Sequence, residues 1–262
     1  MIRRGKLALL LNCIGVVLYE GPSVLTGDPI VVLATFNTAN TKTGNLIQTW
    51  IMRSDVHPLE AIKTGADEAV CWMCPHKGVG GKNRSCYVNM LFGPNKVWTS
   101  YKNGRYDKYT DDYAPLFQGN LLRAGAYGDP VAAPIEVWNQ VLPLAASTTS
   151  YTHMWELVIA ERFKAWTMAS VDTISERVTA KAKGWRTYRV DNGAGLQPGE
   201  VWCPASEPGG MRAQCEDCMG CDGLTRGSKR VDFVTPPHSR GATHFDVWSL
   251  AKEMQQLENY NE

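Results

Sequence analysis

Seven of the eight cysteines fall into two groups whose spacing suits metal binding. The first group follows the pattern C-x2-C-x11-C and comprises Cys71, Cys74 and Cys86. The second follows the pattern C-x11-C-x2-C-x2-C and comprises Cys203, Cys215, Cys218 and Cys221. Thiolates at every third residue of a glycine-containing turn direct several sulfurs to one centre, as iron–sulfur clusters and zinc ions require. The spacing therefore predicts thiolate metal sites rather than structural disulfides.

The number of ligands distinguishes the two groups. Four thiolates complete a [4Fe–4S] cluster or a tetrahedral zinc site, whereas three leave one iron open to substrate, cofactor or water. The C-x2-C-x2-C core of the second group is closer to ferredoxin spacing than to a zinc ribbon. We therefore predict one or two [4Fe–4S] clusters at separate sites, with zinc as the alternative. His76, two residues after Cys74, is a candidate zinc ligand or substrate contact, or a plain loop histidine.

Three further polar residues are candidates for catalysis. Arg123 and Asp129 bracket Gly125 and Gly128, which would let the backbone approach a ligand closely. A salt bridge between the two charged side chains is the structural alternative. His153 is a candidate general acid or base, or a hydrogen-bonding partner of a cluster ligand, with a helix cap as its structural alternative.

These residues must be positioned by the surrounding strands and helices. Two β-branched runs separated by glycine and proline predict a hairpin, and a third strand follows, at Ile14–Tyr19, Ile30–Phe36 and Leu46–Arg53. Later strands are expected at Leu121–Tyr127, Trp166–Ser170, Arg186–Val190, Glu200–Cys203 and Val231–Val234. Apolar periodicity predicts helices at Pro134–Leu142, Trp155–Lys164, Ser175–Lys183 and Phe245–Leu257.

Alternation of strands and helices from residue 121 predicts a parallel sheet with helices outside. Right-handed crossovers then suggest an α/β fold with a complete or partial (β/α) barrel. We treat residues 1–262 as a single domain, with the hairpin and third strand in 1–53 and metal-binding segments at 71–86 and 203–221. Functional residues of such barrels gather where strands end. The chain places several candidates there: the 71–86 cysteines, Arg123, Asp129, His153, Ser170, Asp172, Asp191 and Cys203.

Composition limits the classes of partner. With 27 basic and 26 acidic residues, the chain has no global field that attracts nucleic acid or a membrane surface. A local basic stretch at residues 77–108 is a candidate nucleic-acid patch, with a solvated loop face as its alternative. The run Leu7–Leu18 imitates a secretory signal, but Asn12 and Cys13 interrupt it, and we expect a buried strand. No other apolar run reaches the roughly 18 residues of a membrane span, and free thiolates suit the cytoplasm.

Several motifs together resemble a family of bacteriophage-encoded cysteine-rich proteins, over residues 20 to 235. They are Cys71…Cys74-Pro75-His76-Lys77…Cys86-Tyr87, Arg123…Gly128-Asp129-Pro130, Tyr151-Thr152-His153 and Cys203-Pro204-Ala205-Ser206 with the following cysteines. That family is loosely similar to the radical S-adenosylmethionine (radical SAM) enzymes. In those enzymes a C-x3-C-x2-C loop after the first barrel strand holds a [4Fe–4S] cluster whose open iron binds S-adenosylmethionine.

The resemblance implies a radical-SAM-like barrel, host-cell cytoplasm and a redox or radical-type enzyme with a [4Fe–4S] cluster at the barrel mouth. It makes S-adenosylmethionine a candidate cofactor, His76 and Tyr87 candidate cofactor contacts, and a small-molecule or nucleotide-type compound the expected substrate. The first cysteine loop of this chain differs from the radical SAM loop. It reads C-x2-C-x11-C, and no Gly-Gly-Glu-like segment that would bind the methionine part of the cofactor is evident. Two alternatives remain: a zinc-stabilised protein that binds nucleic acid or a protein partner, and a cluster-carrying sensor without catalysis.

Overall fold

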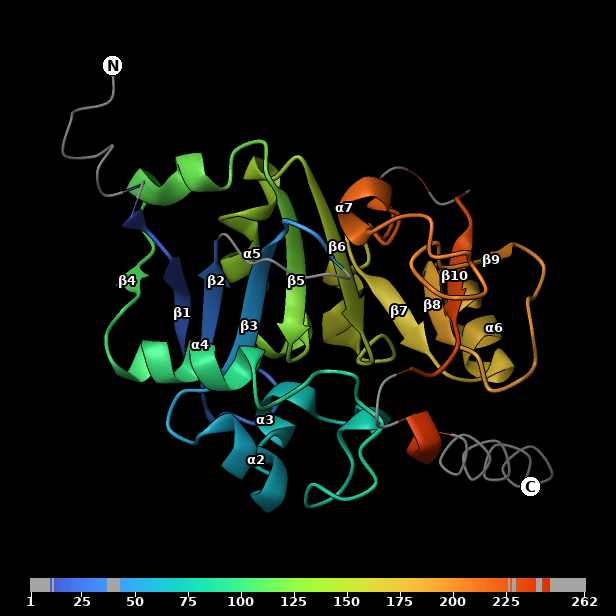
Figure 1. The fold of residues 1–262 in the computed structure, drawn as a ribbon, viewed down its shortest axis with the longest axis horizontal. Coiled ribbons are helices and arrows are strands. Elements are labelled where there is room, and N and C mark those ends of the chain that lie inside the picture. The colour runs from blue at the N-terminus through green and yellow to red at the C-terminus, as the bar shows by residue number, and fades with distance from the viewer. Residues whose placement is uncertain are drawn as a thin grey trace.

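The strands of the protein form one ten-stranded, mostly parallel sheet (Figure 1). A computed structural model describes residues 10, 12–36, 43–225, 227, 230–238 and 242–245. The order across the sheet is β4-β1-β2-β3-β5-β6-β7-β8-β10-β9, and within the described residues β4 and β9 do not pair to close it. The strands are β1 Gly15–Pro22, β2 Pro29–Thr35, β3 Ile47–Arg53, β4 Asp107–Lys108, β5 Leu121–Tyr127, β6 Ser147–Thr152, β7 Met168–Val171, β8 Thr187–Val190, β9 Glu200–Trp202 and β10 Asp232–Thr235.

The first three strands are antiparallel neighbours, so the predicted hairpin and third strand are confirmed. From β3 onward each strand lies parallel to its neighbour, in the order β3, β5, β6, β7, β8 and β10, with β9 parallel to β10 at the edge. The prediction of one largely parallel sheet between residues 121 and 234 is therefore confirmed. We call the face of the parallel strands that carries Arg123, Tyr151 and Tyr188 the free face of the sheet.

The helix predicted at Ser175–Lys183 is confirmed as α6, but two others are shorter than the periodicity predicted. The helix expected at Pro134–Leu142 covers only Ile135–Asn139, and the segment expected to be helical at Trp155–Lys164 forms only a 3-10 helix at Val158–Phe163. The α-helices are α2 Pro58–Thr64, α3 Glu68–Cys71, α4 Gly93–Lys102, α5 Ile135–Asn139, α6 Ile174–Ala182 and α7 Cys215–Cys218. The 3-10 helices are η1 Pro75–Lys77, η2 Asp111–Leu116, η3 Pro130–Ala132, η4 Leu142–Leu144 and η5 Val158–Phe163.

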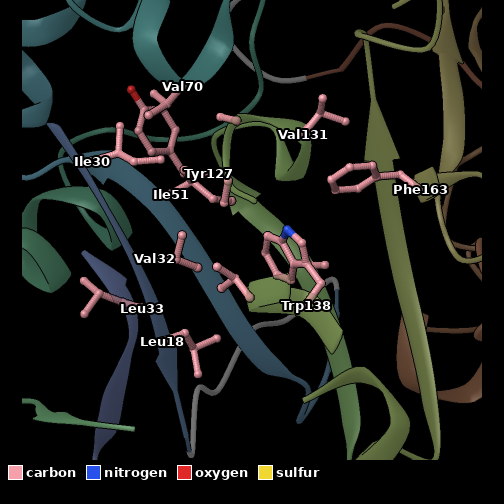
Figure 2. Close-up of a cluster of buried hydrophobic side chains, with 14 of the residues drawn as sticks. Leu18, Ile30, Val32, Leu33, Ile51, Val70, Tyr127, Val131, Trp138 and Phe163 are labelled. Atoms are coloured by element: carbon pink, nitrogen blue, oxygen red, sulfur yellow. The ribbon is translucent and has the colours of Figure 1, made fainter. Parts of the chain in front are cut away.

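The hydrophobic core packs the first strands against the connections that follow β5. Figure 2 shows part of it, with side chains of β1, β2 and β3 beside Tyr127, Val131 and Trp138. The indole of Trp138 is fully buried, and its Nε1 donates to the carbonyl of Pro130 at 3.0 Å. Within β5, Leu122 belongs to this core whereas Arg123 lines a cavity on the other face. The alternation of a strand therefore separates core from cavity.

Two expectations concern residues at the chain ends. The terminal helix expected at Phe245–Leu257 lies almost entirely outside the described residues, as does the first part of the run Leu7–Leu18. The second part of that run continues into β1, where Val16, Val17 and Leu18 are buried. In the part of the chain that the structure describes, no helix is both long and apolar enough to cross a bilayer.

Gly128 allows the end of β5 to pass close to β3, and its replacement should be costly. Its φ is +79°, and a Cβ there would lie 2.4 Å from the carbonyl oxygen of Ile51. Gly128→Ala should lower the free energy of unfolding by about 1–2 kcal/mol for the left-handed backbone and by a further 1–3 kcal/mol or so for overpacking. Urea unfolding would measure this loss.

A matched control separates the two contributions. Gly119 also has a left-handed φ of +72°, but a Cβ there meets no atom within 4 Å. Gly119→Ala should therefore cost only the backbone contribution, about 1–2 kcal/mol. Equal losses in the two variants would show that the close approach at Gly128 has no energetic importance.

Candidate metal centres and cavity

A cavity of about 430 Å³ lies on the free face of the parallel sheet. Strands β5, β6, β7, β8 and β10 contribute to its walls, and both cysteine-containing segments reach it. The cysteines that line it are Cys71, Cys74, Cys86, Cys203 and Cys215. The topology therefore brings two groups that are more than a hundred residues apart to one space.

The three-cysteine group is formed by a compact turn after α3. The backbone N–H of Cys74 donates to the carbonyl of Cys71 at 2.8 Å, and that of Cys86 donates to the carbonyl of His76 at 2.9 Å. Burial raises the pKa of the Cys71 and Cys74 thiols well above the ordinary value, and the neighbouring Cys86 raises both further. The three sulfurs are thus close enough to repel one another as thiolates. A bound cation would remove that repulsion.

The four-cysteine group surrounds a second, much smaller cavity that all four residues line: Cys203, Cys215, Cys218 and Cys221. Burial raises the pKa of the Cys221 thiol well above its ordinary value, a hydrogen bond with Tyr151 opposes the shift, and the other three cysteines add to it. The four residues therefore surround one small cavity.

The cysteine sulfurs do not stand at the spacing of a single bound ion. Among the described residues, no three cysteine sulfurs lie within 4.8 Å of one another. A tetrahedral zinc with bonds of about 2.3 Å would hold its sulfurs only about 3.8 Å apart. Both groups consist of thiols, whose thiolate form is the donor that iron–sulfur clusters and zinc ions take.

Helices α3 and α7, which carry Cys71 and Cys215–Cys218, lie at opposite ends of the strands (Figure 1). Helix α3 lies beyond the end of β5, where the N–H of Asp129 donates to the carbonyl of Val70 at 2.7 Å. Helix α7 lies beside the segment before β3, where the N–H of Asn45 donates to Glu216 Oε2 at 2.6 Å. Although Cys203 follows β9 as expected, the rest of its group lies away from the strand ends that carry the first group. The cavity connects the two.

Arg123 and Tyr87 lie between the groups. The Arg123 guanidinium donates to Tyr87 Oη at 2.5 Å and lies 5.8 Å from its ring. Burial raises the pKa of Tyr87, Arg123 opposes the shift, and Cys86, Cys215 and Cys74 add to it, so this phenol lies near both groups. Among the described residues, no carboxylate lies within ion-pair distance of Arg123. The salt bridge to Asp129 that the sequence offered as the structural alternative is therefore absent, and a half-buried positive charge faces the cavity.

Asp129 instead fixes the ends of two strands. Its carboxylate accepts hydrogen bonds from the N–H of Val131 at 3.0 Å, from Thr152 Oγ1 at 2.8 Å and from the N–H of His153 at 2.9 Å. Burial raises the pKa of Asp129 to about 6, although these donors oppose the shift. Asp129 lines the cavity but is mainly committed to holding the turn after β5 against the end of β6.

His76 and His153 meet at Asp172. His76 Nε2 lies 3.0 Å from Asp172 Oδ1, and His153 Nε2 lies 3.7 Å from Asp172 Oδ2. The other ring nitrogen of His76 hydrogen-bonds Ser85 Oγ at 2.7 Å. The sequence analysis named Asp172 only as a residue at a strand end, without assigning it a role, and it did not single out Ser85. The position of Asp172 just after the buried strand β7 was the only signal for it.

Two other expectations differ from the structure. Asp191 does not line the cavity, because its carboxylate binds the guanidinium of Arg189 at 2.8 Å and the N–H of Gly195 at 3.1 Å. In the basic stretch 77–108, Arg84 is largely buried beside Cys86, and Lys102 donates to the carbonyl of Ser54 at 3.2 Å. These two cations are therefore engaged within the protein.

No protein-family model, curated protein or solved structure matches this chain. Its function must therefore be inferred from the residues of the cavity.

Proposed function

We propose that this chain is an iron–sulfur enzyme with two [4Fe–4S] clusters. Cys71, Cys74 and Cys86 would hold one cluster, whose fourth iron opens onto the cavity. The four-cysteine group would hold the other. One observation carries the proposal: cysteines of both groups line one cavity together with Arg123, a half-buried cation with no carboxylate partner among the described residues. With an open iron, the first cluster would supply one-electron chemistry to a molecule bound beside it.

The order of the strands supports a finer assignment, a partial (β/α) barrel of the radical-SAM-like kind. Six strands follow one another across the sheet in chain order, and the first cysteine loop follows β3, the first of them. This is the place of the cluster loop in radical SAM enzymes. S-adenosylmethionine is therefore a candidate for the molecule at the open iron. The pattern C-x2-C-x11-C distinguishes this loop from theirs.

The protein's own residues would bind and orient the ligand. Arg123 presents a half-buried guanidinium to the cavity and is oriented by Tyr87. A cation of this kind attracts a carboxylate or phosphate group, because planar guanidinium matches both. A volume of about 430 Å³ is within the range of small-molecule sites. The substrate class supported best is a small anionic or nucleotide-type molecule.

Metal analysis provides the direct test. Protein purified without oxygen should be brown and contain about eight iron and eight sulfide ions per chain, since each of two clusters holds four of both. Reduction with dithionite should produce the electron paramagnetic resonance (EPR) signals of reduced clusters. A colourless protein with one or two zinc ions and no sulfide would overturn the proposal and support the structural-zinc alternative.

A further inference from the structure

Three potential metal ligands outside the cysteine groups converge at the wall of the cavity. His76 belongs to η1, His153 follows β6, and Asp172 follows β7. One nitrogen of each imidazole and a carboxylate oxygen all lie within 4.8 Å of one another. These residues come from three separate connections of the sheet. Their meeting is therefore a property of the tertiary fold.

We propose that His76, His153 and Asp172 bind a mononuclear divalent transition-metal ion. Metal–nitrogen and metal–oxygen bonds of about 2.1 Å place neighbouring ligand atoms about 3.0–3.5 Å apart. The imidazole–carboxylate distances of 3.0 and 3.7 Å are close to that spacing. Two imidazoles and one carboxylate, with the remaining positions open, form the ligand set of non-haem ferrous sites. Ferrous iron is therefore the ion that this set fits best.

The surrounding hydrogen bonds orient these ligands. His76 Nδ1 is held by Ser85 Oγ at 2.7 Å, which turns Nε2 toward Asp172. Metal-binding histidines commonly use their second ring nitrogen in this way. Asp172 is fully buried, and its backbone N–H donates to Glu176 Oε2 at 2.8 Å.

The site faces the same cavity as the three-cysteine group. His76, His153 and Ser170 line this cavity, so the open positions of the ion would be accessible to a bound molecule. A divalent ion there would coordinate an oxygen of the ligand and polarise it as a Lewis acid. This role does not depend on a cluster being present. It extends the proposed function, because a redox centre and a Lewis acid would then act on one molecule.

Titration with Mn²⁺ tests the site. Manganese prefers nitrogen and oxygen donors over thiolates, so it should report on this site rather than on the cysteines. The full-length protein, purified without oxygen, freed of mononuclear iron with a chelator and with its clusters oxidised, should remove the EPR signal of about one Mn²⁺ per chain. Asp172→Asn and His153→Gln should each weaken binding by at least tenfold or so, and Ser85→Ala by about tenfold through loss of orientation.

His238 supplies the matched control. It also lines the cavity, but its ring stacks on Tyr87 at 5.2 Å and is not one of the three ligands. His238→Gln should therefore bind Mn²⁺ like the natural sequence. Circular dichroism on every variant identifies any that fail to fold.

The outcomes separate this site from the cluster proposal. Protein that contains iron and sulfide but binds no Mn²⁺ overturns the mononuclear site alone. Folded Asp172→Asn and His153→Gln variants that bind Mn²⁺ as tightly as the unchanged protein would also overturn the mononuclear site. Protein that binds Mn²⁺ at these residues but contains no iron or sulfide supports the mononuclear site and overturns the cluster proposal.

Discussion

Replacing Cys74 by serine should produce a soluble, folded protein that has lost about half of its iron and sulfide, because each of the two proposed clusters holds four of both ions. Activity that depends on the open iron should disappear completely. The loss should stop at one cluster because the four-cysteine group surrounds its own small cavity, which Cys74 does not line. Iron and sulfide analysis together with soluble yield would measure both effects.

The contrasting variant is Cys218→Ser, in the four-cysteine group. This site is closed and binds only protein ligands, so its metal-binding free energy contributes to folding. The variant should therefore lose soluble yield and thermal stability as well as iron. Cys13→Ser is the control, because Cys13 belongs to neither group and its thiol only donates to the carbonyl of Gly15 at 3.4 Å. The reverse pattern, with Cys74→Ser insoluble and Cys218→Ser stable, would contradict the assignment of the two sites.

Replacing Arg186 by alanine should destabilise the protein by up to about 3–5 kcal/mol, the cost of breaking a buried ion pair, because Arg230 at 3.3 Å compensates only part of the Asp222 charge. Arg186 is 1% exposed. Its guanidinium binds Asp222 Oδ1 at 2.6 Å and donates to the carbonyls of Gly220, Gly223 and Val231 at 3.1, 2.8 and 2.7 Å. These bonds hold the turn that carries Cys221. The variant should therefore also lose iron from the second site.

Arg162 provides the comparison for this prediction. Its ion pair with Glu136 at 3.3 Å has both side chains more than 60% exposed. Arg162→Ala should change the free energy of unfolding by less than about 1 kcal/mol, because water screens such a pair. Urea unfolding without oxygen would measure both variants. If they lose similar stability, Arg186 does not hold the second cysteine turn.

The two predictions share a physical basis. Each cysteine group depends on a short turn, but different parts of the fold support the two turns. The first turn follows α3, which packs against the end of β5 through the bond between Asp129 and Val70. The second is held by a buried arginine that projects from the segment before β8. The two sites can therefore be lost independently.

Local sequence patterns determined the cysteine groups and most of the strands of this protein. The spacing of the cysteines defined both groups, because residues within one turn lie close together whatever the fold of the rest of the chain. Apolar runs and turn residues predicted the hairpin, the third strand and most of the parallel strands, since periodicity along a strand is also local. The sequence did not reveal β6, whose residues Ser147–Thr152 lack apolar alternation. These residues form a buried strand because they pair with β5 on one side and with β7 on the other.

Only the tertiary structure decided how the candidate residues combine. His76 and Asp172 are 96 positions apart, and no local pattern relates them. Arg123 and Asp129 are near in sequence, yet the first faces the cavity from within β5 while the second binds the backbone beyond its end. Asp191 follows a strand as expected but pairs with Arg189. Side-chain type and spacing identify what a residue can do, whereas its partners depend on which strands the sheet places side by side.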